Sequence, residues 1–221
     1  MLSINTPASV QSCYDKTANE YAEKFYNELD GKHLDKILLS SFAAQNSQKG
    51  KMIDLGCGPG QTTAALRNFG VVDIVGTDLS PVAIEKAKQL NQSIHFEVAD
   101  MLNLRSVYAE ESFGSAVGFY AIVHFNEMEL MHAFGEIARV LKPGGHFLFS
   151  FHVGEEIVHL DNFLGHDVTI DFYFHNLESI LVLAKQAGFR VIDAIQRAPY
   201  DDIEHPTTRG YVWLEKINPA I

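Results

Sequence analysis

The sequence of 221 residues has only two cysteines, Cys13 and Cys57, which lie far apart. Two such cysteines exclude a disulfide framework and a cysteine-rich metal centre. No run of about 18 apolar residues occurs, so no membrane-spanning helix is expected. The N-terminus has no basic region followed by an apolar run, so no signal peptide is expected either. The expected location is the cytoplasm.

Basic residues are also scarce. There are 17 lysines and arginines against 28 aspartates and glutamates, and the net charge is −11. Binding to a nucleic-acid backbone needs clustered Lys and Arg, so the charge argues against such a partner and favours a small molecule. An apolar content of 47% can form one sizeable core, which predicts a single domain over residues 1–221. The oligomeric state is left open.

The most informative stretch is residues 52–63, which read Met-Ile-Asp-Leu-Gly-Cys-Gly-Pro-Gly-Gln-Thr-Thr. An apolar run enters a loop with alternate glycines, which let the backbone turn sharply and let a ligand approach it. These glycines are Gly56, Gly58 and Gly60. The helix that follows points its N–H groups at that ligand. A second strand over 71–77 then ends in Asp78, so the unit predicts a nucleoside-cofactor site.

Four segments in this order resemble the class I S-adenosylmethionine-dependent methyltransferases. They are Ile53–Gly60, Gly76–Pro81, Phe96–Met101 and Arg139–Phe147. In turn, they are similar to the family's glycine loop, ribose-binding strand end, adenine-binding strand end and the turn before its fifth strand. The resemblance implies S-adenosyl-L-methionine as cofactor and S-adenosyl-L-homocysteine as product, with methyl transfer from the one to an acceptor.

Strand and helix patterns alternate along the rest of the chain. Strands are expected at 52–55, 71–77, 94–98, 113–120, 146–152, 189–196 and 210–216, and helices at 10–29, 33–44, 62–68, 82–91, 127–141 and 177–187. This alternation indicates a largely parallel sheet covered on both faces. The expected fold is α/β and Rossmann-like, with seven mostly parallel strands and an antiparallel last strand.

The expected domain has four parts. They are an N-terminal helical cap over 1–45, a cofactor-binding core over 46–152, an insertion over 153–175, and a C-terminal helix with strands over 176–221. The insertion follows a strand whose carboxyl end faces the ligand crevice, so we expect it to cap the acceptor pocket; the alternative is that it only protects the sheet edge. Within it, residues 168–174 are rich in β-forming side chains.

The resemblance also assigns cofactor contacts. Asp78 would accept hydrogen bonds from the ribose hydroxyls, unless it only stabilises a turn. Asp100 would accept from the adenine amino group beside the Met101 N–H, unless it only caps a strand end. Asp54 would order the glycine loop and contact the amino-acid end, and Phe119 would offer its carbonyl to the ammonium. The full expected set is Tyr14, Tyr21, Asp54, Gly56, Cys57, Gly58, Gly60, Asp78, Leu79, Ser80, Asp100, Met101, Leu102, Phe119 and Tyr120.

Histidines crowd one third of the sequence and supply the catalytic candidates. His124 follows the fourth strand and His152 ends the fifth, and either could take a proton or position the acceptor. Alternatively, His124 only shapes the pocket, or it makes a capping hydrogen bond to the helix that follows at Asn126. The run from His152 to His159 contains two acids, but it lacks the His-Glu-x-x-His spacing and a glycine interrupts it, so no metal is expected.

The acceptor is predicted to be a small molecule methylated on oxygen or nitrogen. The stretch Gly118–Ala121 lacks the Asn/Asp-Pro-Pro-aromatic tetrad of the members that methylate DNA bases. Two alternatives stay open. A domain that binds the cofactor without turnover would carry the same motifs. A nicotinamide-dependent oxidoreductase would use a similar unit, but no tyrosine here has a lysine four positions later.

Overall fold

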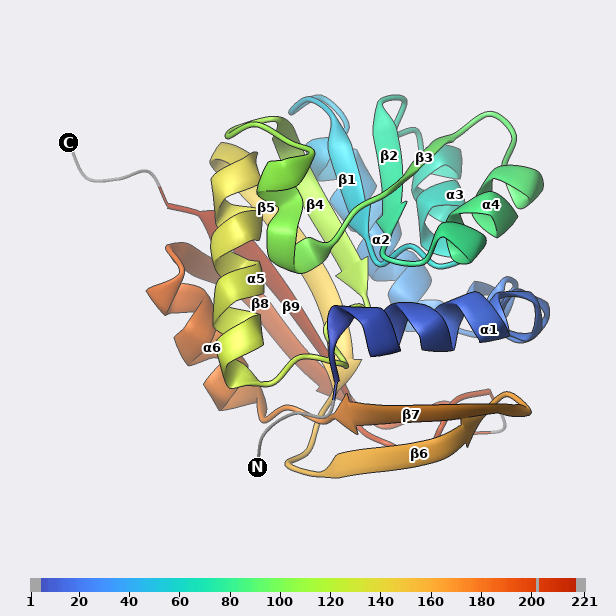
Figure 1. Ribbon diagram of the computed structural model, residues 1–221. Helices are drawn as coiled ribbons and strands as arrows, with labels where there is room; N and C mark the ends of the chain where they lie inside the picture. The colour runs from blue at the N-terminus through green and yellow to red at the C-terminus, as the bar shows by residue number, and fades with distance from the viewer. Residues whose placement is uncertain (1–4, 202, 218–221) are drawn as a thin grey trace.

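The computed structural model describes residues 5–201 and 203–217. The predicted domain of residues 1–221 also includes 1–4, 202 and 218–221, which lie outside the described residues. The main sheet has seven strands in the order β3-β2-β1-β4-β5-β9-β8 (Figure 1). The strands are β1 Met52–Leu55, β2 Ile74–Asp78, β3 His95–Val98, β4 Phe113–Phe119, β5 Leu141–His152, β8 Phe189–Arg197 and β9 Arg209–Lys216.

Strand direction confirms the predicted fold class. β1 pairs in parallel with β2 and β4, β2 with β3, and β4 with β5. The last strand, β9, runs antiparallel to both of its neighbours, β5 and β8. The carboxyl ends of the parallel strands therefore meet at one edge of the sheet, where ligands bind in such folds.

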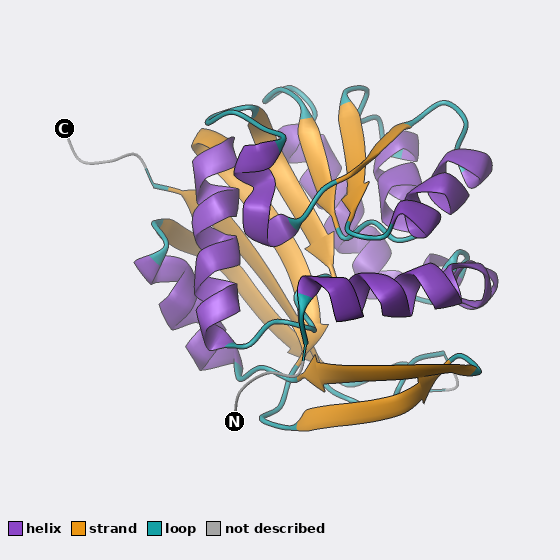
Figure 2. Cartoon of the chain, viewed as in Figure 1, coloured by secondary structure: helices purple, strands orange, loops and turns teal. Residues whose placement is uncertain are grey.

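Helices cover both faces of this sheet (Figure 2). The helices are α1 Pro7–Phe25, α2 His33–Asn46, α3 Gln61–Asn68, α4 Pro81–Leu90, α5 Glu127–Val140 and α6 Leu177–Gln186, with short 3-10 turns η1 Glu28–Asp30 and η2 Met101–Ser106. Among the described residues, none of the helices is long and apolar enough to cross a membrane.

The alternation of side chains in β5 shows how the two faces are filled. Phe147, Phe149 and Phe151 belong to the core cluster that includes residues of α5 and α6. Leu148 belongs to the second cluster, with Phe42 of α2 and Trp213 of β9. Because successive strand residues point to opposite faces, this one strand contributes to both cores.

Some element boundaries differ from those predicted. The N-terminal helix starts at Pro7 rather than at residue 10, because Thr6 caps it in a capping box with Ser9. β2 starts at Ile74 rather than at 71, because the N–H of Val71 is bonded to the carbonyl of Leu66 in the turn after α3. β5 starts at Leu141 because that residue already pairs with Phe113.

The insertion forms a hairpin of β6 Ile157–Phe163 and β7 His166–Tyr173. Its two-residue turn, Leu164 and Gly165, has φ angles of 51° and 85°, which match the hairpin turn that suits twisted strands. The sequence indicated a β-rich segment from 168 onward but not β6. α1 lies across the carboxyl ends of the parallel strands, between the main sheet and this hairpin (Figure 1).

Candidate active site

A pocket lies between α1 and the carboxyl ends of β1, β2 and β4, and we call it the main pocket. Its free space, including the open mouth, is about 1020 Å³. The lining contains Asn5, Thr6, Pro7, Val10, Tyr14, Ala18, Tyr21, Gly56, Gly58, Pro59, Asp78, Leu79, Ala83, Ala99, Asp100, Met101, Leu102, Phe119, Tyr120, Ala121, His124, Phe125 and Glu129. Most of the residues expected to bind a cofactor therefore share one cavity, as does one of the two histidine candidates.

The glycine loop adopts a backbone that only glycine takes easily. Gly56, Gly58 and Gly60 have φ angles of 63°, 53° and 88°. A Cβ atom at Gly56 would lie 2.7 Å from the Cβ of Ala121. The loop therefore needs glycine at position 56 for conformation and for space, and it brings bare backbone to the pocket wall.

Asp78 stands at the end of β2 and joins the loop to the pocket. Its Oδ2 accepts the N–H of Gly58 at 2.9 Å, and its Oδ1 accepts the N–H of Ser80 at 2.9 Å. Each carboxylate oxygen has a second lone pair, so both can accept a further bond from a ligand. Asp78 can therefore stabilise the turn and bind a ligand at the same time, so the two roles considered from the sequence are compatible.

Asp100 is placed in the same way at the end of β3. Its Oδ1 accepts the N–H of Leu102 at 2.8 Å, so it caps η2. The carboxyl group and the neighbouring Met101 and Leu102 also line the main pocket. The capping bond orients the carboxylate and leaves its other oxygen able to accept from a ligand.

A smaller hollow adjoins the main pocket, and we call it the inner hollow. It is lined by Tyr21, Glu28, Leu29, Asp35, Asp54, Gly56, Cys57, Gly58, Gln61, Thr62, Phe119 and Tyr120. Asp54 is buried there and accepts a bond from the Thr63 hydroxyl at 2.6 Å. Burial raises the pKa of Asp54 to about 7, against the opposing effect of the Thr63 bond.

Tyr14 and His124 form the polar pair of the main pocket. The Tyr14 hydroxyl lies 2.7 Å from Nε2 of His124, and Nδ1 of His124 lies 2.9 Å from the carbonyl oxygen of Asp171. A carbonyl only accepts, so Nδ1 carries the proton; in the neutral ring, Nε2 then accepts from Tyr14. Burial lowers the pKa of His124 to about 4, so the ring is neutral at physiological pH.

Asn5 holds this pair in place from the start of the described chain. Its Nδ2 donates to the carbonyls of His124 at 3.0 Å and Asp171 at 2.9 Å. Its Oδ1 accepts the N–H of Asp171 at 2.9 Å. One buried amide thus ties the segment before α1, the loop after β4 and strand β7 together. No sequence signal pointed to Asn5 or Asp171.

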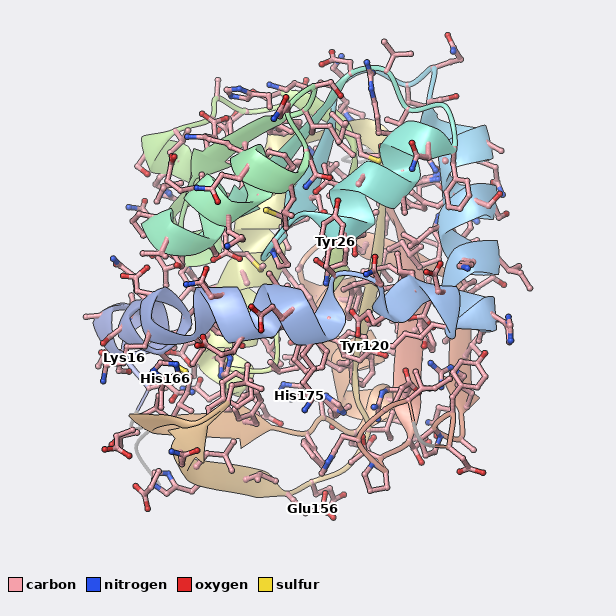
Figure 3. The ribbon with its side chains drawn as sticks, turned by 90° about the vertical axis from the view of Figure 1, so that its right-hand side faces the viewer. Lys16, Tyr26, Tyr120, Glu156, His166 and His175 are labelled. Atoms are coloured by element: carbon pink, nitrogen blue, oxygen red, sulfur yellow. The ribbon has the colours of Figure 1, made fainter. Side chains whose placement is uncertain are left out.

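Tyr120 follows β4 directly and has a strained backbone conformation, with a φ of 55°. Its N–H donates to both the carbonyl and the hydroxyl of Ser150, and its ring lies 4.9 Å from Nζ of Lys32 and 5.6 Å from the guanidinium carbon of Arg209. Figure 3 shows Tyr120 between α1 and the main sheet. A positive φ at a tyrosine is uncommon and occurs where surrounding contacts enforce it, often at a ligand site.

Other expected residues lie outside the main pocket. Gly60 begins α3, and Ser80 is fully buried, where it caps α4 by accepting the N–H of Ala83. Cys57 lines only the inner hollow and packs against Ile84 and Phe96. Burial raises the pKa of the Cys57 thiol well above its usual value, which is consistent with a packing role.

His152 is not brought to the main pocket. Its Nδ1 lies 2.7 Å from the Thr207 hydroxyl, and its ring stacks on Phe174 at 5.2 Å. The other histidines of the crowded region bond elsewhere: His132 to Leu102, His146 to Lys49, His159 to Asp171 and Asp161, and His166 to Glu20. These histidines are close together in the sequence, but the fold places only His124 among them in the lining of the main pocket.

The insertion contributes no residue to the lining of the main pocket. Instead it packs behind the lining, since Phe172 lies 4.6 Å from the ring of His124 and Phe163 lies 6.4 Å from that of Tyr14. Figure 3 labels Lys16 and His166 where α1 and the hairpin meet. There, Lys16 donates to the Asp167 carbonyl, and His166 lies 3.3 Å from Glu20. The hairpin therefore supports the roof of the pocket and does not itself cover it.

Comparison with known proteins identifies the family. A model described as "Methyltransferase domain" matches residues 52–145. The chain belongs to the class I S-adenosylmethionine-dependent methyltransferases. It is 28% identical to the O-methyltransferase cnsE of Penicillium expansum over 64% of this chain and 52% of that protein. It is 32% identical to the O-methyltransferase resE of Aspergillus sclerotiorum over 70% of this chain and 58% of that protein.

The alignments with the first four curated relatives span from 32% to 58% of those proteins. Solved methyltransferase structures agree in fold. The magnesium protoporphyrin IX methyltransferase of Synechocystis, whose structure holds S-adenosylmethionine, has a TM-score of 0.71 at 13% identity, covering 98% of this chain and 99% of that one. At this identity, the likeness shows the fold alone.

The residues present fit the methyltransferase cofactor. The bare backbone of the glycine loop and the acidic residues Asp78 and Asp100 in the pocket lining suit a nucleoside with its ribose hydroxyls and amino group. The inner hollow continues from the main pocket past Phe119 and Tyr120, and it holds the buried carboxylate of Asp54. Within the described residues, no group of three or more His, Cys, Asp or Glu side chains could hold a metal ion.

Proposed function

We propose that this protein is an S-adenosylmethionine-dependent methyltransferase that methylates oxygen or nitrogen of a small molecule. The observation that carries the proposal is the meeting of the glycine loop, Asp78 and the Tyr14–His124 pair in one pocket. The first two belong to a cofactor site, and the third offers polar groups to a second molecule. The organisation of residues 1–221 as one domain is part of this proposal.

The cofactor half of the site uses residues from three strand ends. Asp78 would hold the ribose, Asp100 and Met101 the adenine, and Asp54 with the Phe119 carbonyl the amino-acid end. When bound, the cofactor supplies an electrophilic methyl group on a good leaving group, so the protein's main task is alignment. Leu79 and Leu102 would pack on the base. Gly60 and Ser80 would act indirectly, by starting α3 and α4.

Tyr14 and His124 would serve the acceptor. Burial raises the pKa of Tyr14 well above its usual value, so its hydroxyl stays protonated and donates to His124. The Tyr14 oxygen can then accept a hydrogen bond from an acceptor hydroxyl or amine. A neutral imidazole with a low pKa is a weak base, so His124 would first help to position the acceptor. As the new bond to the methyl group makes the acceptor proton more acidic, that proton would pass to Tyr14 while the Tyr14 proton passes to His124.

Three observations support a small acceptor. α1 roofs the pocket and the hairpin supports that roof, which suits an enclosed ligand. The net charge of −11 does not favour a polyanion. Several relatives, including those from Penicillium expansum and Aspergillus sclerotiorum, bear the name O-methyltransferase.

Calorimetry with S-adenosylhomocysteine and with NADH tests the cofactor. We expect binding of the first and none of the second. Asp78→Ala should weaken binding by about 1–3 kcal/mol, the usual cost of an unpaired hydrogen-bonding group. The matched control is Asp73→Ala, which removes an exposed aspartate before the same strand. NADH binding without S-adenosylhomocysteine binding would refute the assignment.

Methyl transfer is tested with deuterated-methyl cofactor and a metabolite panel, followed by mass spectrometry. A labelled small molecule is the expected product. Cofactor binding without any labelled product would favour the alternative in which the domain binds the cofactor without turnover. Labelled protein or nucleic acid in a lysate would contradict the proposed acceptor class.

A further inference from the structure

The ionisable groups that line the main pocket are all acidic or neutral. Asp78, Asp100 and Glu129 supply carboxylates, and Tyr14, Tyr21, Tyr120 and His124 supply the other titratable groups. Of the lysines and arginines in residues 5–201 and 203–217, none contributes to the lining. A ligand in this pocket therefore meets negative charge without direct positive charge from the protein.

The nearest cations are already paired. Lys32 and Arg209 contact the ring of Tyr120 without lining the pocket themselves. Nζ of Lys32 lies 2.6 Å from Glu28 and 3.5 Å from Glu204. Arg209 donates to the carbonyls of Thr207 and His205 and lies 3.8 Å from Glu204. Freeing Lys32 for a ligand would break its ion pair with Glu28, and freeing Arg209 would take a cation from the cluster around the buried Glu204, so either change is costly.

The start of α1 lines the pocket but has few N–H groups to offer. A helix N-terminus attracts anions through its free N–H groups. Here Pro7 has no N–H, the N–H of Ser9 donates to the Thr6 hydroxyl, and that of Val10 donates to the Thr6 carbonyl. This helix start therefore does not replace a missing lysine or arginine.

Apolar side chains also line the pocket near the Tyr14–His124 pair. Val10 and Ala18 lie one turn before and one turn after Tyr14 on α1, and Phe125 follows His124 in the chain. An anion buried against such side chains costs several kcal/mol unless a counter-charge is present. A flat apolar body gains from the same contacts.

We infer that the acceptor enters this pocket uncharged, as a neutral hydroxyl compound with an apolar, ring-sized body, and that the pocket rejects carboxylates and phosphates. The inference rests on the proposed function and narrows its acceptor class. The hydroxyl would donate to the Tyr14 oxygen while the ring lies against Val10 and Phe125.

The test compares benzyl alcohol and benzoate as probes of the protein loaded with S-adenosylhomocysteine. Binding is measured by ligand-observed NMR titration, which needs no knowledge of the natural acceptor. We expect benzyl alcohol to bind at least about tenfold more tightly than benzoate, because only the anion lacks a counter-charge. Val10→Trp should abolish this binding by filling the space beside Tyr14, while calorimetry shows that S-adenosylhomocysteine still binds.

Glu129→Gln tests the effect of pocket charge alone, without the change in volume that Val10→Trp introduces. The amide oxygen can keep the capping bond to the Asn126 N–H, which the carboxylate accepts at 2.9 Å, while the charge is lost. The preference for benzyl alcohol over benzoate should fall by about threefold to tenfold. Glu127→Gln, an exposed acid in the same helical turn, should leave it unchanged.

Benzoate binding as tightly as benzyl alcohol at the Val10-dependent site would overturn the inference. So would the absence of any such binding, since an open apolar pocket holds ring-sized fragments. In both cases, S-adenosylhomocysteine binding would leave the cofactor assignment intact. Loss of that binding in the unmodified protein would instead refute the proposed function itself.

Discussion

The hydroxyl of Tyr14 and the Nε2 of His124 lie 2.7 Å apart, although 110 positions separate them in the chain. One comes from the helix that roofs the pocket and the other from the loop after β4. Their contact therefore exists only when the roof is closed on the sheet. The pair joins a structural role to the proposed acceptor role, and the two can be separated by experiment.

A double-mutant cycle of Tyr14→Phe and His124→Asn should reveal direct coupling. Each single change leaves a buried polar group without its partner, which costs about 1–3 kcal/mol of unfolding free energy. The double variant should lose less than the sum, by about 0.5–2 kcal/mol. Urea unfolding measures all four proteins. Strictly additive losses would mean that the 2.7 Å contact contributes nothing.

Activity should respond differently from cofactor affinity in the same variants. Tyr14→Phe should keep S-adenosylhomocysteine affinity within about threefold, yet slow methyl transfer by about 10²-fold if the pair passes a proton. A raised KM with an unchanged kcat would indicate positioning alone. An equal loss of cofactor affinity would place Tyr14 in the cofactor half of the pocket.

Asn5→Ala should loosen the roof of the pocket. The change leaves the buried N–H of Asp171 without its acceptor, so we expect a loss of about 1–3 kcal/mol in unfolding free energy. Hydrogen exchange should rise in β7 and in the first turn of α1. Asn162→Ala is the matched control, because its side chain bonds only the exposed hairpin turn. Unchanged exchange in β7 would show that Asn5 is not the tie inferred from its contacts.

His175 should make the protein less stable as the pH falls. Burial lowers its pKa to about 4 from the ordinary 6.5. Between these values the unfolded chain binds the proton more readily, so unfolding is favoured as the pH drops from about 6.5 to 4. His175→Phe should reduce the pH slope of the unfolding free energy by up to about 1.4 kcal/mol per pH unit.

Comparing variants isolates this effect, because other buried groups titrate in the same range. Burial also lowers the pKa of His124 and His152, to about 4 and about 3. The raised pKa of Asp54, about 7, acts in the opposite sense. Urea unfolding at several pH values provides the measurement. His95→Gln, at a side chain 64% exposed, should keep the wild-type profile. An unaltered slope in His175→Phe would contradict the prediction.

Glu204→Gln should destabilise the fold strongly. The Glu204 side chain is 1% exposed and accepts bonds from Arg197 at 2.6 and 2.8 Å. Removing its charge leaves Arg197, Lys32 and Arg209 undercompensated in a buried cluster, and breaking such a cluster costs about 3–5 kcal/mol. Thermal unfolding measures the loss, with Glu110→Gln at an exposed loop as control. A loss below about 1 kcal/mol would show that water or rearrangement compensates the cluster.

Local rules predicted the order and type of the main elements. β1 spans the predicted residues 52–55, because an apolar run that ends in a glycine loop has few other solutions. α5 ends at Val140, close to the predicted position, since Pro143 cannot continue a helix. The sequence did not predict β6, because its exposed positions carry polar residues, such as His159, Asp161 and Asn162. Only pairing with β7 makes this segment a strand.

The sequence by itself determined where the glycine loop, Asp78 and Asp100 lie, because these residues form local turns at strand ends, and they make up the proposed cofactor half of the site. The proposed acceptor half depended on tertiary structure. Only packing could separate His124 from His152, place Tyr14 against it and anchor both through Asn5 and Asp171. The contacts of His124 with Asn5 and Tyr14 join segments more than a hundred positions apart, and no periodicity or spacing in the chain encodes them. The ion pair of Lys32 with Glu204 likewise joins distant segments, and it keeps this cation from facing a ligand in the pocket.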